Sequence, residues 1–234
     1  MWVKLVMMAN VVSLFWGTKY SLDYVNVLYN MVKRNLTIPF NFYCMTDDFN
    51  RNFDKQITLL PIPKPVMNGW WNKLHLFNPN LGLEGNVLFL DLDIVILNNI
   101  NEFFTIGKDE DFYVMRDFAQ PNTINSSVLR FNVEHHSHIW DRYLEDKTRF
   151  DTYHSDQSVI NLTMLKSPQT KFFPDQWTYS YKWPTRGDTK QYDSNRSQNY
   201  TFKQNAKISI FHGNPDPHVA MHHESGKWIK NYWK

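Results

Sequence analysis

Two acidic residues, Asp91 and Asp93, stand in residues 87–97 (VLFLDLDIVIL), a run that is otherwise apolar. An ionised carboxylate is costly to bury unless it is paired or binds a metal. Carboxylate oxygens with an open coordination sphere suit Mg²⁺ or Mn²⁺ bound to a diphosphate. The simpler alternative is a turn at the end of a strand that carries two solvated acids. The apolar runs on both sides favour the metal site.

Strands and helices alternate in the first half of the chain. Apolar residues at helical spacing predict a helix over residues 20–35, with Asp23 in its first turn and Lys33 and Arg34 in its last, as the helix dipole favours. A helix is also expected over 69–77, and strands over 11–15, 40–48, 55–62 and 86–93. The alternation predicts an α/β fold with a mainly parallel sheet. Ligands bind beyond the carboxyl ends of such strands, where Asp91 and Asp93 lie.

The second half is less regular. Strands are expected over 111–117, 126–132 and 207–213, and helices over 133–150 and 156–165. Residues 174–200 are polar and aromatic without periodicity, and a loop of that length in a compact domain is usually functional or disordered. No internal repeat or linker is recognisable. We therefore expect a single domain over residues 1–234.

Composition excludes some classes of protein. The 234 residues are 42% hydrophobic and include nine tryptophans, so aromatic rings could serve the core or stack on sugars or bases. A net charge of +2 argues against a general nucleic-acid-binding protein. The one cysteine, Cys44, permits no disulfide framework or cysteine-based metal site within the chain. We expect Cys44 to be a buried strand residue of a cytoplasmic protein.

The first residues resemble a signal peptide only superficially. Lys4 precedes an apolar stretch, but Asn10 and Ser13 interrupt it and no small-x-small cleavage site follows. The stretch is also too short to span a membrane. A first core strand is the better interpretation, and no integral membrane segment is expected.

Residues 88–97 (LFLDLDIVIL) resemble the DxD motif of GT-A glycosyltransferases, particularly the glycogenin-like family 8 and its bacterial and viral relatives. Further segments resemble elements of that family in the same order along the chain. They are the opening nucleotide-binding unit at 15–48, GWWNKLHLF at 69–77, NSSVLRFN at 125–132, DQSVIN at 156–161 and FHGNPDPH at 211–218.

The resemblance implies a fold and an activity. The fold would be GT-A, with a Rossmann-like nucleotide-binding half at about 10–100, a mixed central sheet, and a sugar and acceptor half at about 101–234. The activity would be metal-dependent transfer of a hexose from a UDP-sugar, UDP-glucose or UDP-galactose, with retention of anomeric configuration. The acceptor would be a glycan, protein or lipid that the sequence does not identify.

The resemblance also implies roles for particular residues. Asp91, Asp93 and His212 would hold Mn²⁺, with Mg²⁺ as the alternative. Gly213 would let the backbone approach the diphosphate, and Lys73 would reach the phosphate or the sugar unless it is an exposed lysine on an amphipathic helix. The residues expected near uracil and ribose are Thr18, Tyr20 and Asp47, although Asp47 could instead start a turn.

The donor sugar would be surrounded by Asp117, Asn125, Asp156 and Gln157, although each could instead be a turn or cap residue. Gln157 is assigned a positioning role because an amide is a poor nucleophile. Asp216 stands where the family usually has a lysine. Lys182 is the first candidate to supply the missing positive charge, and Arg186 is the second. Ser127 stands where family 8 often has glycine.

Other interpretations remain open. A binding protein on the same fold could hold a nucleotide or glycan without turnover, and a nucleotidyltransferase would require a glycine-rich phosphate loop that WGTKYS lacks. His135 and His138 are one helical turn apart, but zinc would need further ligands. Residues 227–234 form an amphipathic segment that either covers the core or touches an anionic membrane.

Overall fold

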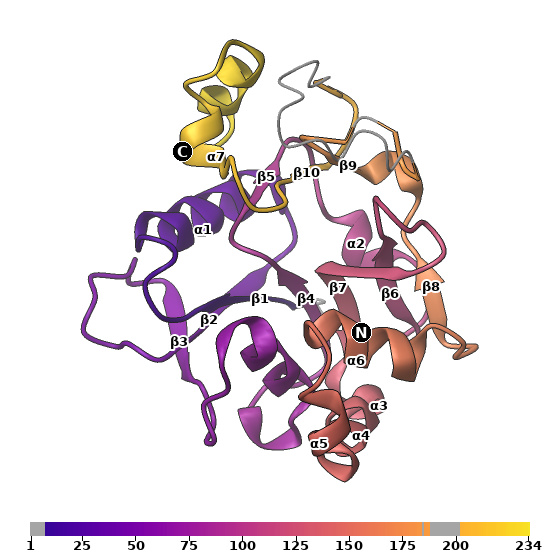
Figure 1. Cartoon of the computed structure of the whole chain (residues 1–234). Helices are drawn as coiled ribbons and strands as arrows, with labels where there is room; N and C mark the ends of the chain where they lie inside the picture. Colours follow the sequence, from indigo (N-terminus) through magenta and orange to yellow (C-terminus); the bar gives the residue numbers. More distant parts are fainter. Residues whose placement is uncertain (1–7, 184, 188–201) are drawn as a thin grey trace, which may run out of the picture.

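The computed structural model describes residues 8–183, 185–187 and 202–234. In this part of the chain, β1 to β4, β7, β6 and β8 form a mixed sheet of seven strands (Figure 1). Its order is β3 (Ile57–Pro61), β2 (Phe40–Thr46), β1 (Ala9–Phe15), β4 (Asn86–Leu90), β7 (Ile124–Asn132), β6 (Phe112–Arg116) and β8 (Thr170–Phe172). The first four strands are parallel, β7 is antiparallel to β4 and β6, and β8 is parallel to β6.

Both faces of the central strands are buried. Along β1, Val11 and Phe15 belong to one hydrophobic cluster, while Val12 and Leu14 belong to the cluster on the other face. Strand β4 alternates in the same way. This is why these strands are almost continuously apolar rather than alternating with polar residues. Cys44 on β2 is fully buried, as expected.

The two faces are covered by different elements (Figure 1). Helix α1 (Asp23–Asn35) and the short α2 (Glu102–Thr105) lie on one face, together with a three-stranded sheet. That sheet pairs β10 (Ile208–Ile210) antiparallel to β5 (Ile94–Ile96) and parallel to β9 (Thr178–Ser180). The other face carries the 3₁₀ helices η1 (Gly69–Phe77) and η2 (Pro79–Leu81) and a group of helices from the second half.

The prediction of one helix over residues 133–150 is wrong. The segment forms α3 (Val133–His136), α4 (His138–Glu145) and α5 (Lys147–Phe150), and α6 (Asp156–Met164) follows. Asp146, between α4 and α5, has φ −133° and ψ 37°, which is outside the helical region. The chain therefore turns there, and Tyr143 and Phe150 both become buried.

The C-terminal segment covers the core. After η3 (Asp175–Trp177), β9, β10 and α7 (Pro217–Ala220), the 3₁₀ helix η5 (Glu224–Asn231) buries Ile229 completely. Trp228, Tyr232 and Trp233 pack against the same hydrophobic cluster as α1. These contacts favour the core-covering interpretation of residues 227–234.

The tripeptide Asp91–Leu92–Asp93 joins the two sheets. Strand β4 of the large sheet ends at Leu90, and β5 of the small sheet begins at Ile94. The backbone N–H of Asp91 donates to the carbonyl of Ser127 on β7 at 2.9 Å. The carbonyl of Asp93 accepts from the N–H of Phe211, just after β10, at 3.1 Å. The two acids are thus anchored to different sheets.

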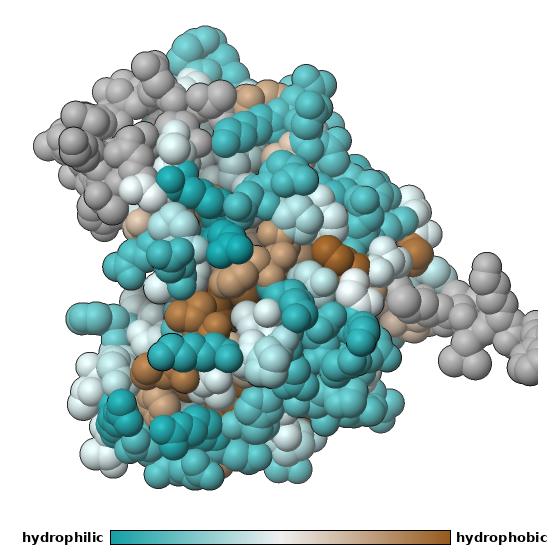
Figure 2. All heavy atoms as spheres, turned by 90° about the vertical axis from the view of Figure 1, so that its right-hand side faces the viewer, coloured by the Kyte–Doolittle hydropathy of each residue, from teal (hydrophilic) through white to brown (hydrophobic). Residues whose placement is uncertain are grey.

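The face shown in Figure 2 is largely hydrophilic, although apolar side chains gather in a band across its middle. Large apolar side chains that are exposed include Val66, just before η1, and Trp70, at its start. None of the described helices is long and apolar enough to cross a membrane.

Candidate active site

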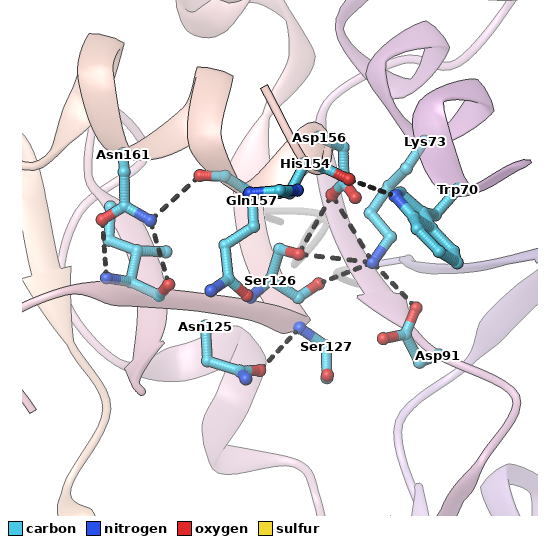
Figure 3. A network of polar contacts seen from close by, with 11 residues as sticks. Trp70, Lys73, Asp91, Asn125, Ser126, Ser127, His154, Asp156, Gln157 and Asn161 are labelled. Carbon is cyan, nitrogen blue, oxygen red and sulfur yellow. Dashed lines mark hydrogen bonds and ion pairs between the residues drawn. The ribbon is translucent and has the colours of Figure 1, made fainter. Parts of the chain in front are cut away.

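Lys73 on η1 lies at the centre of a buried polar network (Figure 3). Its Nζ is 2.9 Å from Asp91 Oδ1 and 3.7 Å from Asp156 Oδ2. It also donates to the carbonyl and the hydroxyl of Ser126, each at 3.3 Å. We call Lys73, Asp91, Ser126 and Asp156 the Lys73 network. It joins η1, the end of β4, β7 and the start of α6.

The charge of Lys73 is kept by its neighbours. Burial lowers the pKa of this amine, but the carboxylates of Asp156 and Asp91 outweigh burial, and the pKa is raised overall. Only 5% of Lys73 is exposed, which excludes the interpretation as a surface lysine. Its contact with a phosphate or sugar stays a prediction.

The start of α6 is held against β7. The carboxylate of Asp156 accepts from the Ser126 hydroxyl at 3.0 Å, and Gln157 Oε1 accepts from the Ser126 N–H at 3.2 Å. Asn161, one turn later, exchanges hydrogen bonds with the backbone of Ile124. Ser155 is the residue at the N-cap position, so Asp156 is not a cap residue. Asp156 thereby shares the Lys73 ammonium group with Asp91, and Gln157 is fixed to β7.

Asp93 has a different environment. Tyr20, after β1, donates its hydroxyl hydrogen to Asp93 Oδ2 at 3.0 Å, and Lys19 Nζ donates to the Tyr20 hydroxyl at 2.6 Å. Burial, followed by the charge of Asp91, raises the pKa of Asp93 to about 7, and Asp216 acts in the same direction. We call Lys19, Tyr20, Asp93 and Asp216 the Asp93 group.

Both aspartates line one pocket of about 200 Å³, which we call the aspartate pocket. Trp70 is 54% exposed at this pocket, and its indole Nε1 donates to the carbonyl of His154 at 3.1 Å (Figure 3). The lining residues are Leu14, Trp16, Lys19, Tyr20, Trp70, Asp91, Leu92 and Asp93.

Asp91 and Asp93 fit a divalent cation in their chemistry. Their carboxylates line the same pocket, and the pKa of Asp93 is raised first by burial and then by the negative charge of Asp91, which a cation would balance. Hard oxygen donors of this kind suit Mn²⁺ or Mg²⁺. These observations support the two aspartates as ligands.

His212 is not brought together with the two aspartates. Its imidazole packs against Trp183 and Phe118, with ring centroids 5.2 and 5.0 Å away. In the described residues, no group of three or more His, Cys, Asp or Glu side chains is arranged to hold a metal. However, His212 Nε2 is buried and has no hydrogen-bond partner among the residues that the structure describes, and burial lowers the pKa of the ring to about 4. The imidazole is therefore neutral, the form that binds metals, and its role as a third ligand stays a prediction.

The loop after β10 contains the other predicted diphosphate residues. Gly213 has φ +59°, a conformation that favours glycine. Lys182 Nζ donates to the carbonyl of Asn214 in this loop at 2.8 Å. Burial lowers the pKa of Lys182, while Asp216 and Asp93 partly oppose this shift. Arg186 instead pairs with Asp175 and binds Thr178, so Lys182 is the better-placed cation.

Two of the predicted donor-site residues, Asp47 and Asp117, accept hydrogen bonds from backbone N–H groups. Asp47 accepts from the backbone N–H of Gly17 at 3.2 Å, which ties the loop after β1 to the end of β2, and Thr18 in that loop is exposed. Asp117 accepts from two backbone N–H groups of its own turn and from Asn125 Nδ2 at 3.2 Å. The turn interpretation is therefore supported for Asp117, whereas Asp47 links two loops, and the contacts of both residues with a donor stay predictions.

Three residues of the site were not singled out by the sequence. Ser126 lies within the NSSVLRFN segment, Lys19 precedes Tyr20, and Trp70 belongs to the GWWNKLHLF segment. Each therefore adjoins a recognised residue or lies within a recognised segment. Of the histidines at 135–138, His136 is fully buried with Nδ1 at 3.1 Å from the Asn132 carbonyl, whereas His135 and His138 are exposed.

The mixed sheet, the smaller sheet and the Asp91–Leu92–Asp93 junction define a GT-A fold, and the chain is structurally similar to family 8 glycosyltransferases over most of its length. One similar structure is the galactosyltransferase LgtC in complex with donor and acceptor sugar analogues. The identity is 12%, the TM-score is 0.63, and the match covers 95% of this chain and 93% of LgtC.

Two further structures show the same fold. The glycosyltransferase GlyE of Streptococcus pneumoniae TIGR4 is 16% identical, with a TM-score of 0.63, over 89% of this chain and 56% of GlyE. Mouse xyloside xylosyltransferase 1 is 14% identical, with a TM-score of 0.58, over 89% of this chain and 98% of that protein. Comparison of the sequence with protein-family models and with curated proteins finds no match.

Proposed function

We propose that this protein is a metal-dependent glycosyltransferase that moves a hexose from a UDP-sugar to an acceptor with retention of anomeric configuration. The observation that carries the proposal is the pair of aspartates at the end of β4, which line one pocket on a GT-A fold. In retaining transfer the sugar–phosphate bond breaks and negative charge develops on the departing diphosphate. The site must therefore bring positive charge to that position.

Asp91 and Asp93 would hold Mn²⁺ or Mg²⁺, with His212 as a third ligand, and this ion would stabilise the charge of the diphosphate. Lys182 supplies a second positive charge. Its Nζ already binds the loop that contains Gly213 and Asn214, where the resemblance puts the diphosphate. Tyr20, Thr18 and Asp47 would lie along the uridine.

Asp156 and Gln157 would position the donor sugar, together with Asp117 and Asn125. The charge of Asp156 is partly balanced by Lys73, and Gln157 Oε1 accepts a backbone hydrogen bond from Ser126. An amide oxygen that is held in this way is suited to orientation and not to attack. Lys73 would act on the sugar mainly by fixing Asp91 and Asp156.

A second candidate is a protein that binds the nucleotide without turnover. Asp216 favours this candidate. The aspartate is only 8% exposed and lies in the loop after β10, where it repels negative charge at a position at which related enzymes usually have a lysine. Release of UDP from UDP-glucose or UDP-galactose separates the two candidates. An enzyme cleaves the UDP-sugar and forms UDP, faster when an acceptor is added, whereas a binding protein leaves the UDP-sugar intact.

The binding site is tested first by thermal unfolding with UDP, GDP, CDP and ADP, each with Mn²⁺ and with EDTA. A ligand at 100 times its Kd adds about 2.7 kcal/mol, which raises Tm by roughly 5–10 °C in a chain of this size. We expect a rise with UDP that requires Mn²⁺. The absence of a rise with any nucleotide, in folded protein, would contradict both candidates.

A further inference from the structure

A second pocket, of about 400 Å³, lies beside the start of η1 and is not used by the proposed donor. We call it the Trp71 pocket. Its volume is in the range of sites that bind small molecules. The lining residues are Pro65, Val66, Met67, Asn68, Trp71, Tyr143, Lys147 and Asp151.

The polar end of the Trp71 pocket is organised before any ligand binds. The Tyr143 hydroxyl donates to Asp151 Oδ1 at 3.2 Å, and the ammonium group of Lys147 pairs with Asp151 Oδ2. The ion pair has no net charge. It therefore gives no preference for an anionic or a cationic ligand, and both side chains are 47% exposed, so that hydroxyl groups of a ligand can reach them. A neutral ligand with many hydroxyl groups satisfies these groups best.

The rest of the pocket lining includes aromatic and apolar side chains. The rings of Trp71 and Tyr143 have centroids 6.0 Å apart and planes inclined by 30°, and Tyr143 is only 2% exposed. A pyranose ring has apolar C–H faces that pack on aromatic rings and hydroxyl groups that bind carboxylates and amides. Asn68 adds an amide to the polar groups that line the pocket. The lining therefore matches both properties of a sugar.

The two pockets are linked through η1. Trp70 lines the aspartate pocket and Trp71 lines the second pocket. The Trp70 indole is fixed to the carbonyl of His154, which closely follows Asp151 in the chain. Consecutive residues of one 3₁₀ helix therefore contribute an aromatic ring to each of the two pockets.

We propose that the Trp71 pocket binds a neutral sugar ring of the acceptor, and that the acceptor is a glycan of more than one sugar. Its role as an acceptor site depends on the proposed glycosyltransferase function, whereas sugar binding by the pocket does not. One sugar ring would lie on Trp71 near Asp151, and the glycan would extend past Trp70 to the aspartate pocket.

The test is calorimetric titration of the protein, without nucleotide or metal, with lactose, maltotriose and cellotriose. At least one of them binds, and Asp151→Asn and Trp71→Ala each weaken binding about tenfold or more. Asp146→Asn is the matched control, because Asp146 forms a similar ion pair with Arg149 at 3.5 Å but does not line the pocket. Equal binding by all four proteins, or no binding by folded protein, overturns the proposal.

The same protein sample is titrated with UDP and Mn²⁺ to separate the two proposals. Sugar binding without UDP binding leaves the pocket in place and contradicts the glycosyltransferase. UDP binding without sugar binding supports the nucleotide site and contradicts the sugar-binding role of the Trp71 pocket. Where transfer is measurable, the trisaccharides have a lower KM than glucose or galactose, and Asp151→Asn removes that difference. A KM that does not depend on acceptor length contradicts the acceptor role.

Discussion

The two acids of one tripeptide have opposite surroundings. Asp91 is paired with a buried ammonium group at 2.9 Å, whereas Asp93 is bound by a tyrosine hydroxyl and is repelled by Asp91 and Asp216. The protein balances the first charge with its own side chain. The second charge is opposed only in part by Lys19, and the pKa of Asp93 stays raised, which is the arrangement expected where a cation binds.

The two groups also differ in how they are built. The Lys73 network joins η1, β7 and α6 around a nearly inaccessible lysine. The Asp93 group draws its other members from the loops that follow β1 and β10. Loops on a rigid scaffold commonly carry binding residues. The comparison assigns stability mainly to the first group and ligand binding mainly to the second.

The largest effect is expected from Lys73→Met. This change leaves the buried Asp156 and the partly exposed Asp91 without their cation, and removal of one partner from a buried ion pair costs about 3–5 kcal/mol. Urea unfolding measures the loss, with Lys55→Met on the surface as the control. A loss below about 1 kcal/mol would mean that Lys73 does not balance Asp91, and the contrast with Asp93 would disappear.

Asp93→Asn is expected to separate binding from stability. The free energy of unfolding without ligand should not fall, because the change removes a repelled carboxylate and keeps an oxygen that accepts from Tyr20. The Mn²⁺-dependent stabilisation by UDP, about 2.7 kcal/mol at 100 times the Kd, should be lost. Thermal unfolding measures both, and Asp141→Asn is the exposed control. Wild-type stabilisation by UDP in the variant would remove Asp93 from the metal site.

Lys182→Ala tests the second positive charge. We expect kcat/KM for the donor to fall about tenfold, since a charged hydrogen bond contributes about 1.5–3 kcal/mol. Lys182→Arg should recover part of the loss because the charge is kept. Steady-state kinetics with UDP-glucose and UDP-galactose measure both variants. Unchanged kinetics in Lys182→Ala would mean that Lys182 does not supply the second positive charge and that Asp216 has no compensating cation in this side chain.

Asp216→Asn should have the smallest effect and the opposite sign. Removal of its negative charge should tighten UDP binding about threefold, as expected for a partly screened interaction below 1 kcal/mol. Calorimetry with UDP and Mn²⁺ measures the change. Weaker binding would instead make Asp216 a partner of the cation, and the Asp93 group would then resemble the Lys73 network in being internally balanced.

Much of the fold was predictable from local patterns. Apolar runs and helical spacing predicted β1, α1, β2, β3 and β4 to within a few residues. The three-residue strands β8 and β9 were not predicted, because such short segments carry too little periodicity. The break at Asp146 was also missed, since it results from packing of Tyr143 and Phe150 rather than from a glycine or proline.

The site was only partly predictable. Motif order identified Lys73, Asp91 and Asp156, and the structure brings these three together. His212 was grouped with the aspartates, but its ring direction depends on contacts with Trp183 and Phe118, which are distant in sequence. Ser126 was missed because its role depends on strand pairing, which lets one residue contact both η1 and α6.

The junction between the two sheets has a mechanical consequence. Asp91 is fastened through its backbone to the large sheet and Asp93 to the small one. A ligand that binds both carboxylates therefore links the two sheets, because a movement of one sheet relative to the other would strain its bonds to Asp91 and Asp93. Binding of such a ligand should slow amide hydrogen exchange in β5 and β10 of the small sheet as well as at the end of β4 in the large sheet. One binding event would then restrict the motion of both sheets.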